Sequence, residues 1–330
     1  MEVLDLRLIR TEDLRPLLEA EGSVWRENLR WDYSATGAMV LRFMEARALT
    51  GYAVLEGSRV VGYSFYVMES GKALIGDAFV HPEYRGGEHE VQLMTHLLET
   101  LQATPGLRRI EAQLLNLDGA AIREHFQSIG FQGYDRQFLY LAIPDAGGFP
   151  AAEDTAVRIV EWDSRWFPAA AGLILESYRG HVDSAISDQY RTQAGAVRFL
   201  ENIIRLPGCG TFLPPASFLA VSGDAAARSR LCGMILTSVV SDRVAHITQL
   251  CVEPKKQGRG LGSRLIGQVV GVLRQKGFQG ATLSVTVANT RAVELYRSLG
   301  FVPLTCFPAF VWDAPARPRR FTPKKMAARS

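Results

Sequence analysis

A glycine-rich segment at residues 257–262, with the sequence QGRGLG, constrains this chain more than any other feature. It separates a strand-like run at 244–252 from a helix-like run at 263–275. A strand that leads through glycines into a helix forms a cradle for phosphate, because backbone N–H groups converge there and the helix N-terminus adds partial positive charge. The segment lacks the Gly-Lys-Ser/Thr of a nucleoside-triphosphate loop and the G-x-G-x-x-G of a dinucleotide fold. Its spacing is Gln/Arg-x-x-Gly-x-Gly/Ala, which indicates a phosphate cradle of another kind.

The two halves of the chain repeat one another. Near the start of each, a tyrosine is followed by Gly-Ala and Arg-Phe, at residues 33–43 and 190–199. Further on, FVHP at 79–82 matches CVEP at 251–254, and each half later has an Ile/Leu-Gly-Phe triplet. A repeat of this length predicts two tandem domains. We place them at residues 1–143 and 156–313, with a linker at 144–155 and a tail at 314–330.

The element order of the second half is that of an α/β domain. Strand-like runs at 216–221, 231–240 and 244–252 precede a helix, an alternating strand at 283–287, a second helix and a final strand. Together with the loop spacing, this order resembles the GNAT superfamily of N-acetyltransferases. The resemblance implies two tandem GNAT domains, each with a mixed, mostly antiparallel sheet flanked by helices.

The resemblance also implies that acetyl-CoA is the cofactor and that the loop holds its pyrophosphate. In the family, a bulge splays two strands apart and admits the pantetheine arm. A backbone amide beside the bulge, here that of Leu250, then stabilises the oxyanion that forms from the acetyl carbonyl. The implied cofactor-binding residues are Leu250, Val252, Gln257, Gly258, Arg259, Gly260, Leu261, Gly262, Ser263 and Asn289.

Tyr296 is the candidate general acid. It lies in the pattern Asn289-x-x-Ala-x-x-x-Tyr-x-x-x-Gly-Phe, which resembles the second CoA-binding segment of the family, where the tyrosine protonates the departing thiolate. A purely structural role as a core aromatic is the alternative. Phe126 occupies the matching place in the first half, so an aromatic ring satisfies packing in both halves, but only the second keeps a hydroxyl. A buried hydroxyl costs free energy unless it is paired, which favours a function for it.

His246 is the candidate base. It precedes Leu250 by four residues, and we expect both on one face of the strand, where histone-modifying relatives carry a glutamate. An alkylammonium with a pKa near 10.4 must lose a proton before it can attack, and imidazole is suited to take it at pH 7. A water molecule as the base, with His246 as a hydrogen-bonded sheet residue, is an equal alternative. Cys251 should face the other way as a buried apolar residue rather than a nucleophile.

The resemblance implies that residues 178–191 and a last hairpin at 303–310 wall the acceptor site. Within the first of these segments, Asp183 and Asp188 would hold an ammonium group, and His181 and Tyr190 would orient it. A solvated loop face is the alternative for each residue. The expected acceptor is a small-molecule or peptide amine. The tandem architecture is also similar to that of the mycothiol synthases. Three functions therefore stay open: acetylation of an amine, transfer of another or mycothiol-type acyl group, and a non-catalytic CoA-binding or interaction module.

The first half is not expected to bind CoA. Its loop reads RGGEHE at 85–90, so Glu88 and Glu90 stand where Gly260 and Gly262 do. A carboxylate about 6 Å from a phosphate costs about 3 kcal/mol at an effective dielectric of 20. The places of His246, Tyr296 and Asn289 are taken by Leu74, Phe126 and Gly119. We expect this half to be a structural partner, which makes the chain a pseudo-dimer and the protein a monomer or weak dimer.

Composition excludes several classes of protein. The four cysteines and six histidines are scattered without the spacing of a disulfide framework or a metal site. No apolar run is long enough to span a membrane and the N-terminus lacks a signal-peptide pattern, so a cytoplasmic protein is expected. The tail at 314–330 holds six basic residues and no acid; removing these six from the net charge of +3 leaves −3. We expect a disordered tail and no nucleic-acid partner.

Overall fold

A single mixed sheet runs through the whole molecule. The computed structural model describes residues 1–144, 149, 157–206, 208–223 and 229–315. The strand order of the sheet is β1-β2-β3-β4-β5-β13-β6-β12-β11-β10-β9-β7, and β8 pairs with β10 outside this path. The strands of the first half of the sequence are β1 Glu2–Asp5, β2 Thr50–Glu56, β3 Arg59–Glu69, β4 Lys72–Val80, β5 Arg109–Gln113 and β6 Gln132–Ala142. Those of the second half are β7 Val157–Glu161, β8 Thr211–Phe212, β9 Phe218–Ser222, β10 Arg230–Ser241, β11 Val244–Val252, β12 Gly280–Thr286 and β13 Val302–Asp313.

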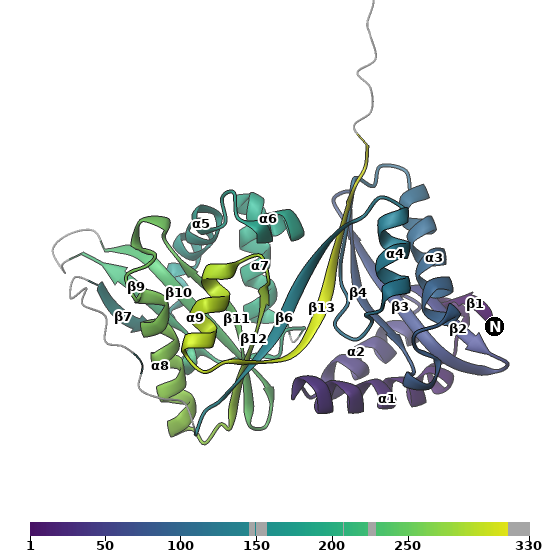
Figure 1. Ribbon diagram of the computed structural model, residues 1–330, viewed down its shortest axis with the longest axis horizontal. Helices are drawn as coiled ribbons and strands as arrows, with labels where there is room; N and C mark the ends of the chain where they lie inside the picture. The colour runs from purple at the N-terminus through teal and green to yellow at the C-terminus, as the bar shows by residue number, and fades with distance from the viewer. Residues whose placement is uncertain (145–148, 150–156, 207, 224–228, 316–330) are drawn as a thin grey trace, which may run out of the picture.

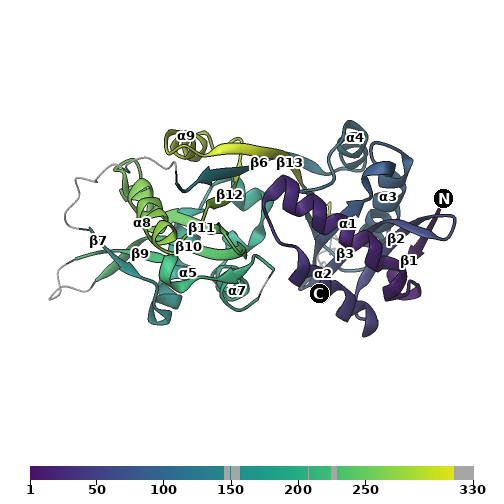
Figure 2. The ribbon, with the colours of Figure 1, turned by 90° about the horizontal axis from the view of Figure 1, so that it is seen from below.

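Helices cover both faces of this sheet in each half, and each of these faces carries one hydrophobic core. A smaller fifth cluster contains Leu29, Phe138 and Phe307. Figure 2 shows α3, α4, α8 and α9 on one side of the strands and α1, α2, α5 and α7 on the other. In the first half the helices are α1 Thr11–Leu29, α2 Ser34–Glu45, α3 Glu88–Ala103 and α4 Ala120–Ser128. In the second half they are α5 Phe167–Ser177, α6 Val182–Ile186, α7 Gln193–Arg205, α8 Leu261–Gln275 and α9 Thr290–Ser298. No helix among the described residues is long and apolar enough to cross a membrane.

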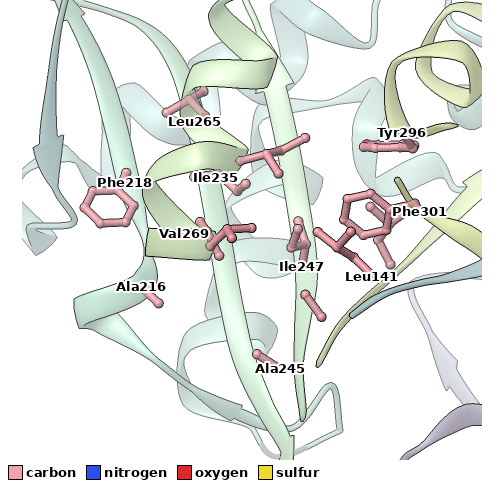
Figure 3. Close-up of a cluster of buried hydrophobic side chains, with 14 of the residues drawn as sticks. Leu141, Ala216, Phe218, Ile235, Ala245, Ile247, Leu265, Val269, Tyr296 and Phe301 are labelled. Carbon is pink, nitrogen blue, oxygen red and sulfur yellow. The ribbon is translucent and has the colours of Figure 1, made fainter. Parts of the chain in front are cut away.

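The last strands of the two halves are exchanged. β6 ends the first half of the sequence, yet it pairs with β12 and places Leu139 and Leu141 in the core under α8 and α9. Figure 3 shows Leu141 beside Ile247 and Phe301 of the second half. In turn, β13 pairs with β5 and sends Phe310 into the core under α3 and α4. The two strands pair with each other at the centre of Figure 1, so each half completes the sheet of the other.

The strand exchange bears on two predictions, the last hairpin and the domain boundaries. The prediction of a last hairpin at 303–310 is wrong, because β13 is one continuous strand between β5 and β6. The boundaries predicted at 143 and 156 describe segments of sequence, and each of these segments contributes its last strand to the other sheet region. Most of the predicted linker at 144–155 and the tail from residue 316 lie outside the described residues, although Phe149 packs against the second-half core.

The two pairs of parallel strands diverge, and this positions the site. β11 and β12 are in register only from Val244↔Gly280 to Ile247↔Leu283. The divergence begins where the β10–β11 register shifts between Leu236 and Thr237, which leaves Thr248 as the bulged residue. β4 and β5 likewise pair only over residues 72–74. The expected bulge and splay are therefore confirmed in the strand register of the second half.

The exchange predicts that two phenylalanines of different halves are energetically coupled. Phe126 on α4 and Phe310 on β13 are fully buried and stacked, with ring centroids 4.1 Å apart. Replacing either by alanine should cost about 3–5 kcal/mol of unfolding free energy. A double-mutant cycle, measured by denaturant unfolding, should give a coupling of about 0.5–3 kcal/mol because stacked residues in contact are not independent.

The exposed Val302 on the same strand provides the control for this cycle. Pairing Phe126→Ala with Val302→Ala should give additive losses. Additive losses for the Phe126 and Phe310 pair would contradict the observed strand exchange.

Candidate active site

The glycine loop joins β11 to α8 through a short 3-10 turn, η6 Pro254–Lys256. Gly258 has φ +78° and Gly260 has φ +74°, a left-handed conformation that side chains other than glycine rarely adopt. Gly260 is the N-cap of α8, and this cap residue makes no side-chain hydrogen bond to the helix; nor does a hydrogen bond of another described side chain cap it. The first N–H groups of α8 therefore keep their capacity to donate to an anion.

Arg291, which is not among the predicted site residues, contacts this loop. Arg291 Nη1 on α9 donates to Gln257 Oε1 at 3.1 Å, and Gln257 Nε2 donates to Val252 O at 3.0 Å. A Cβ at Gly258 would lie 2.7 Å from Arg291 Nη2, so the missing side chain makes room for the guanidinium. Arg259 is exposed beside it. The sequence does contain a sign of this contact: Arg291 is a cation two residues after Asn289, on the first turn of α9.

The backbone of β11 directs the Leu250 amide toward the diverging side. Glu253 N donates to Cys232 O of β10 at 2.9 Å, which sets the hydrogen-bonding direction of this stretch. Backbone groups alternate along a strand, so Leu250 N–H and Val252 C=O point away from β10 and toward β12. The ladder between β11 and β12 has already ended at Ile247. A donor directed at the space between separated strands fits the oxyanion role predicted for Leu250.

Tyr296 lies on α9 near the same region. It is buried and its ring packs edge-on against Phe301, with centroids 5.6 Å apart. Burial raises the pKa of Tyr296, and the negative charge of Asp183 raises it further. The side chain therefore keeps its proton at neutral pH. Asn289 is the N-cap of α9, accepting from Ala292 N at 3.3 Å, which is a structural role; its contact with the cofactor stays a prediction.

His246 lies away from this group. Its ring is buried against Phe138 and Trp31, with centroids 5.5 and 5.1 Å away, and its Nδ1 is 2.9 Å from Thr282 Oγ1. Burial lowers the pKa of His246 to about 3, and the charge of Arg136 acts in the same direction. No contact recorded for the described residues joins His246 to Tyr296 or to the glycine loop.

The expectation that His246 and Leu250 share a face of β11 is wrong. Leu250 packs with the core under α8, whereas His246 contacts first-half aromatic residues on the opposite face. The bulge at Thr248 adds one residue to the strand, and one residue reverses the alternation of side chains beyond it. Cys251 does face away from Leu250, into the core under α5 and α7, and burial raises its pKa to about 12.

Three of the four predicted acceptor residues cluster around α6. Asp183 accepts from Thr286 Oγ1 of β12 at 2.5 Å. Burial raises the pKa of Tyr178, Tyr190 and Tyr296, and the charge of Asp183 adds to this effect. Tyr190 stacks on Tyr178 with ring centroids 4.1 Å apart. His181 is the N-cap of α6, because its Nδ1 accepts from Asp183 N at 3.1 Å. The Thr286 contact thus joins Asp183 of the acceptor segment to β12.

Asp188 has another partner. Its carboxylate pairs with Lys72 of β4, and its backbone N–H donates to Glu111 Oε1 of β5 at 2.9 Å. An acid that already holds an ammonium group from its own chain is not available for the acceptor in this arrangement. The predicted role of Asp188 in binding the acceptor therefore has no support in its contacts.

The first half holds the acceptor segment in place through a buried ion network. Arg109 Nε donates to Glu111 Oε1 at 2.6 Å, and its Nη1 pairs with Asp313 at 2.8 Å. Its Nη2 donates to the carbonyls of Ala185 and Ile186 in α6, at 2.5 and 3.3 Å. Arg109 and Glu111 are almost fully buried. The sequence did not reveal this network, since nothing in its pattern links β5 to residues 185–188.

The corresponding loop of the first half is already filled by its own carboxylate. Glu90 Oε2 accepts from Gly86 N at 3.0 Å, and the Glu90 side chain is buried, which raises its pKa. In β4 the register with β3 shifts at Gly76. Polar groups lie beside this bulge: Tyr33 donates to Asp77 Oδ2 at 2.5 Å and Tyr63 to Glu21 Oε2 at 2.7 Å. These contacts favour the structural role predicted for this half.

The chain belongs to the GNAT acetyltransferase family. The family model described as "Acetyltransferase (GNAT) family" matches residues 11–131 and again 182–301, which together make up most of the sequence. The chain is therefore a tandem GNAT protein with an α/β fold, as expected. The described residues contain no cluster of side chains that could hold a metal ion.

Curated relatives are similar over part of the chain. A mycothiol acetyltransferase from Nocardia farcinica is 31% identical over 143 residues, which is 40% of this chain and 46% of that protein. A [ribosomal protein bS18]-alanine N-acetyltransferase from Salmonella typhimurium is 36% identical over 75 residues, 23% of this chain and 50% of that protein. The chain thus spans about half the length of these relatives.

Solved structures share the whole architecture. A GCN5-related N-acetyltransferase from Sphaerobacter thermophilus superposes with a TM-score of 0.66 at 15% identity and covers 94% of this chain and 95% of its own. A tandem GNAT protein from the clavulanic acid biosynthesis pathway has a TM-score of 0.61 at 16% identity, with 96% and 99% covered. At such identities the likeness shows the fold alone.

The buried state of His246 predicts a specific dependence of stability on pH. Its pKa is about 3 in the folded protein and about 6.5 in an unfolded chain. Above pH 6.5 both states are neutral; below it only the unfolded state takes up the proton, so stability falls as the pH falls toward 3. Between pH 7 and 5, wild type should lose about 2 kcal/mol more than His246→Leu in denaturant unfolding. Equal losses would show that His246 titrates alike in both states.

Proposed function

We propose that the protein is an N-acetyltransferase that moves an acetyl group from acetyl-CoA to a primary amine by direct attack on the thioester. Residues 156–313 would form the catalytic domain and residues 1–143 its structural partner. One arrangement carries the proposal: the glycine loop and the Leu250 amide follow the end of the β11–β12 ladder, and Tyr296 packs in the same core as Leu250 and Val252. The family match supports acyl transfer in general.

The residues at this place fit the pyrophosphate of CoA. The left-handed glycines present uncapped N–H groups of α8, and the guanidinium of Arg291 adds positive charge directly beside Gly258. Acetyl-CoA would supply an activated acetyl thioester. The predicted ligands of its diphosphate and pantetheine remain the loop at 257–263, with Leu250, Val252 and Asn289, and we add Arg291.

The chain's own groups supply the remaining chemistry. Asp183, partly buried on α6, would bind the acceptor ammonium. Leu250 N–H would donate to the carbonyl oxygen as negative charge develops there. Tyr296 would donate its proton to the departing sulfur, and its raised pKa keeps that proton available. Cys251, with a pKa of about 12, would be un-ionised near pH 7, so an acyl-enzyme on its sulfur is not favoured.

We assign removal of the ammonium proton to water. Both His246 and water are open on the sequence alone. The His246 ring is enclosed by Phe138 and Trp31 on the face of β11 opposite Leu250, and the burial that lowers its pKa to about 3 disfavours proton uptake there, whereas a water molecule can pass the proton on to solvent. Asp183 would hold the ammonium while a neighbouring water takes its proton.

A mycothiol-type acceptor is the second candidate. It is favoured by the 31% identity with the Nocardia farcinica mycothiol acetyltransferase over 143 residues. The similarity to the bS18-alanine N-acetyltransferase instead favours a peptide amine. Both relatives support acetyl as the transferred group.

Tyr296→Phe tests the assigned acid. The change should lower kcat by about 10²–10⁴-fold, because the ring still packs but the proton donor is gone. The dissociation constant for acetyl-CoA should stay within about 2-fold. Thiol release from acetyl-CoA in the presence of amines measures the first quantity, and calorimetry measures the second. Tyr140→Phe on β6 removes a hydroxyl whose bond to Gln279 O is long, 3.4 Å, and serves as the control. Unchanged turnover in Tyr296→Phe would contradict the assignment.

A further inference from the structure

Arg136 is a cation from the first half of the sequence that lies on the acceptor side of the second half. It lies on the exchanged strand β6, in register with Thr286 of β12 and Phe307 of β13. Its guanidinium carbon is 5.7 Å from the Phe307 ring centroid, and its Nη1 donates to Gln113 Oε1. The Nε atom is buried and has no hydrogen-bond partner. Among the described residues, no carboxylate lies within ion-pair distance of Arg136.

Asp183 is an anion on the same side, and among the described residues no lysine or arginine forms an ion pair with it. Its contacts are the hydroxyl of Thr286 at 2.5 Å and the His181 ring, 3.6 Å from Oδ2. The carboxylate is about one-sixth exposed, with a relative side-chain area of 17%. No ion pair joins Asp183 to Arg136 within the described residues, although both are neighbours of Thr286.

The two charges act on the same tyrosine. Burial raises the pKa of Tyr190, the charge of Asp183 raises it further, and the charge of Arg136 lowers it. Side chains directly opposite on neighbouring strands share one face of the sheet, which puts Arg136 on the face where Thr286 meets Asp183. The acceptor segment therefore faces two opposite charges that do not neutralise each other. Charges that are partly removed from water are costly without a partner.

We propose that the acceptor carries an anionic group, a carboxylate or a phosphate, in addition to its primary amine. Arg136 binds the anion through its planar guanidinium, and Asp183 binds the ammonium. The inference rests on the proposed acetyltransferase function and adds its substrate class. It also gives the first half of the sequence a direct part in specificity, because the exchange of β6 carries Arg136 into the second-half site.

Matched pairs of amines test this proposal. Glycylglycine and glycylglycinamide differ in a carboxylate, and O-phosphoethanolamine and ethanolamine differ in a phosphate. Initial rates of thiol release from acetyl-CoA give kcat/KM for each amine. Titration of the protein–CoA complex with N-acetylglycylglycine and its amide gives binding without turnover. The variants are Arg136→Gln and Arg136→Lys, with Arg123→Gln, an arginine paired with Asp118 and Asp135, as the control. Thermal unfolding and acetyl-CoA affinity report on intact folding.

In wild type and Arg123→Gln, the anionic compound of at least one pair should have a kcat/KM or an affinity roughly 10- to 100-fold higher than that of its neutral partner. Arg136→Gln should remove that preference while acetyl-CoA affinity stays unchanged, and Arg136→Lys should retain part of it. Equal values for charged and neutral members in wild type would overturn the proposal, as would a preference that survives Arg136→Gln. An anion preference in binding without acetyl transfer to any amine would uphold Arg136 and overturn the acetyltransferase function instead.

Discussion

The antiparallel pairing of β6 with β13 holds the molecule together and sets the geometry of everything else. Each strand bonds on one edge to its counterpart and on the other to a strand of the opposite half. An unpaired strand edge is a site for aggregation, and here neither β5 nor β12 is left with one. The same arrangement takes Leu139 and Phe310 into cores that their own sequence segments do not otherwise build. The halves are thus parts of one sheet rather than two domains in contact (Figure 1).

This shared sheet explains how a half without an open phosphate loop can serve the other. The side chain of Glu90 occupies the loop amide of Gly86, so the first half has a carboxylate where the second has free N–H groups. Its β5 strand instead carries Arg109, whose guanidinium binds two carbonyls of the acceptor segment. A buried arginine with several fixed acceptors holds a segment more rigidly than surface contacts would. In the proposed enzyme, the first half would therefore act on the acceptor side, and the second half would bind the cofactor.

Local patterns in the sequence predicted the local parts of the site. The glycine loop follows from the spacing of a strand–loop–helix unit, whereas the bulged strand and the Leu250 amide were implied by the resemblance to the GNAT family. The strand exchange could not be read in this way, because two repeated strands can change places without altering the pattern of either. His246 was misplaced because a single bulged residue, Thr248, reverses the faces of β11. Asp188 was assigned to the acceptor because its partner, Lys72, is 116 residues away in sequence.

The most direct test of the account is the number of acetyl-CoA sites per chain, measured by calorimetric titration. Two loop glycines with the same left-handed backbone conformation are replaced: Gly260→Glu in the second half and Gly86→Glu in the first, with φ of +74° and +73°. The account predicts one saturable site per chain, lost in Gly260→Glu and retained in Gly86→Glu. Two sites in wild type, or a single site that disappears only in Gly86→Glu, would contradict it.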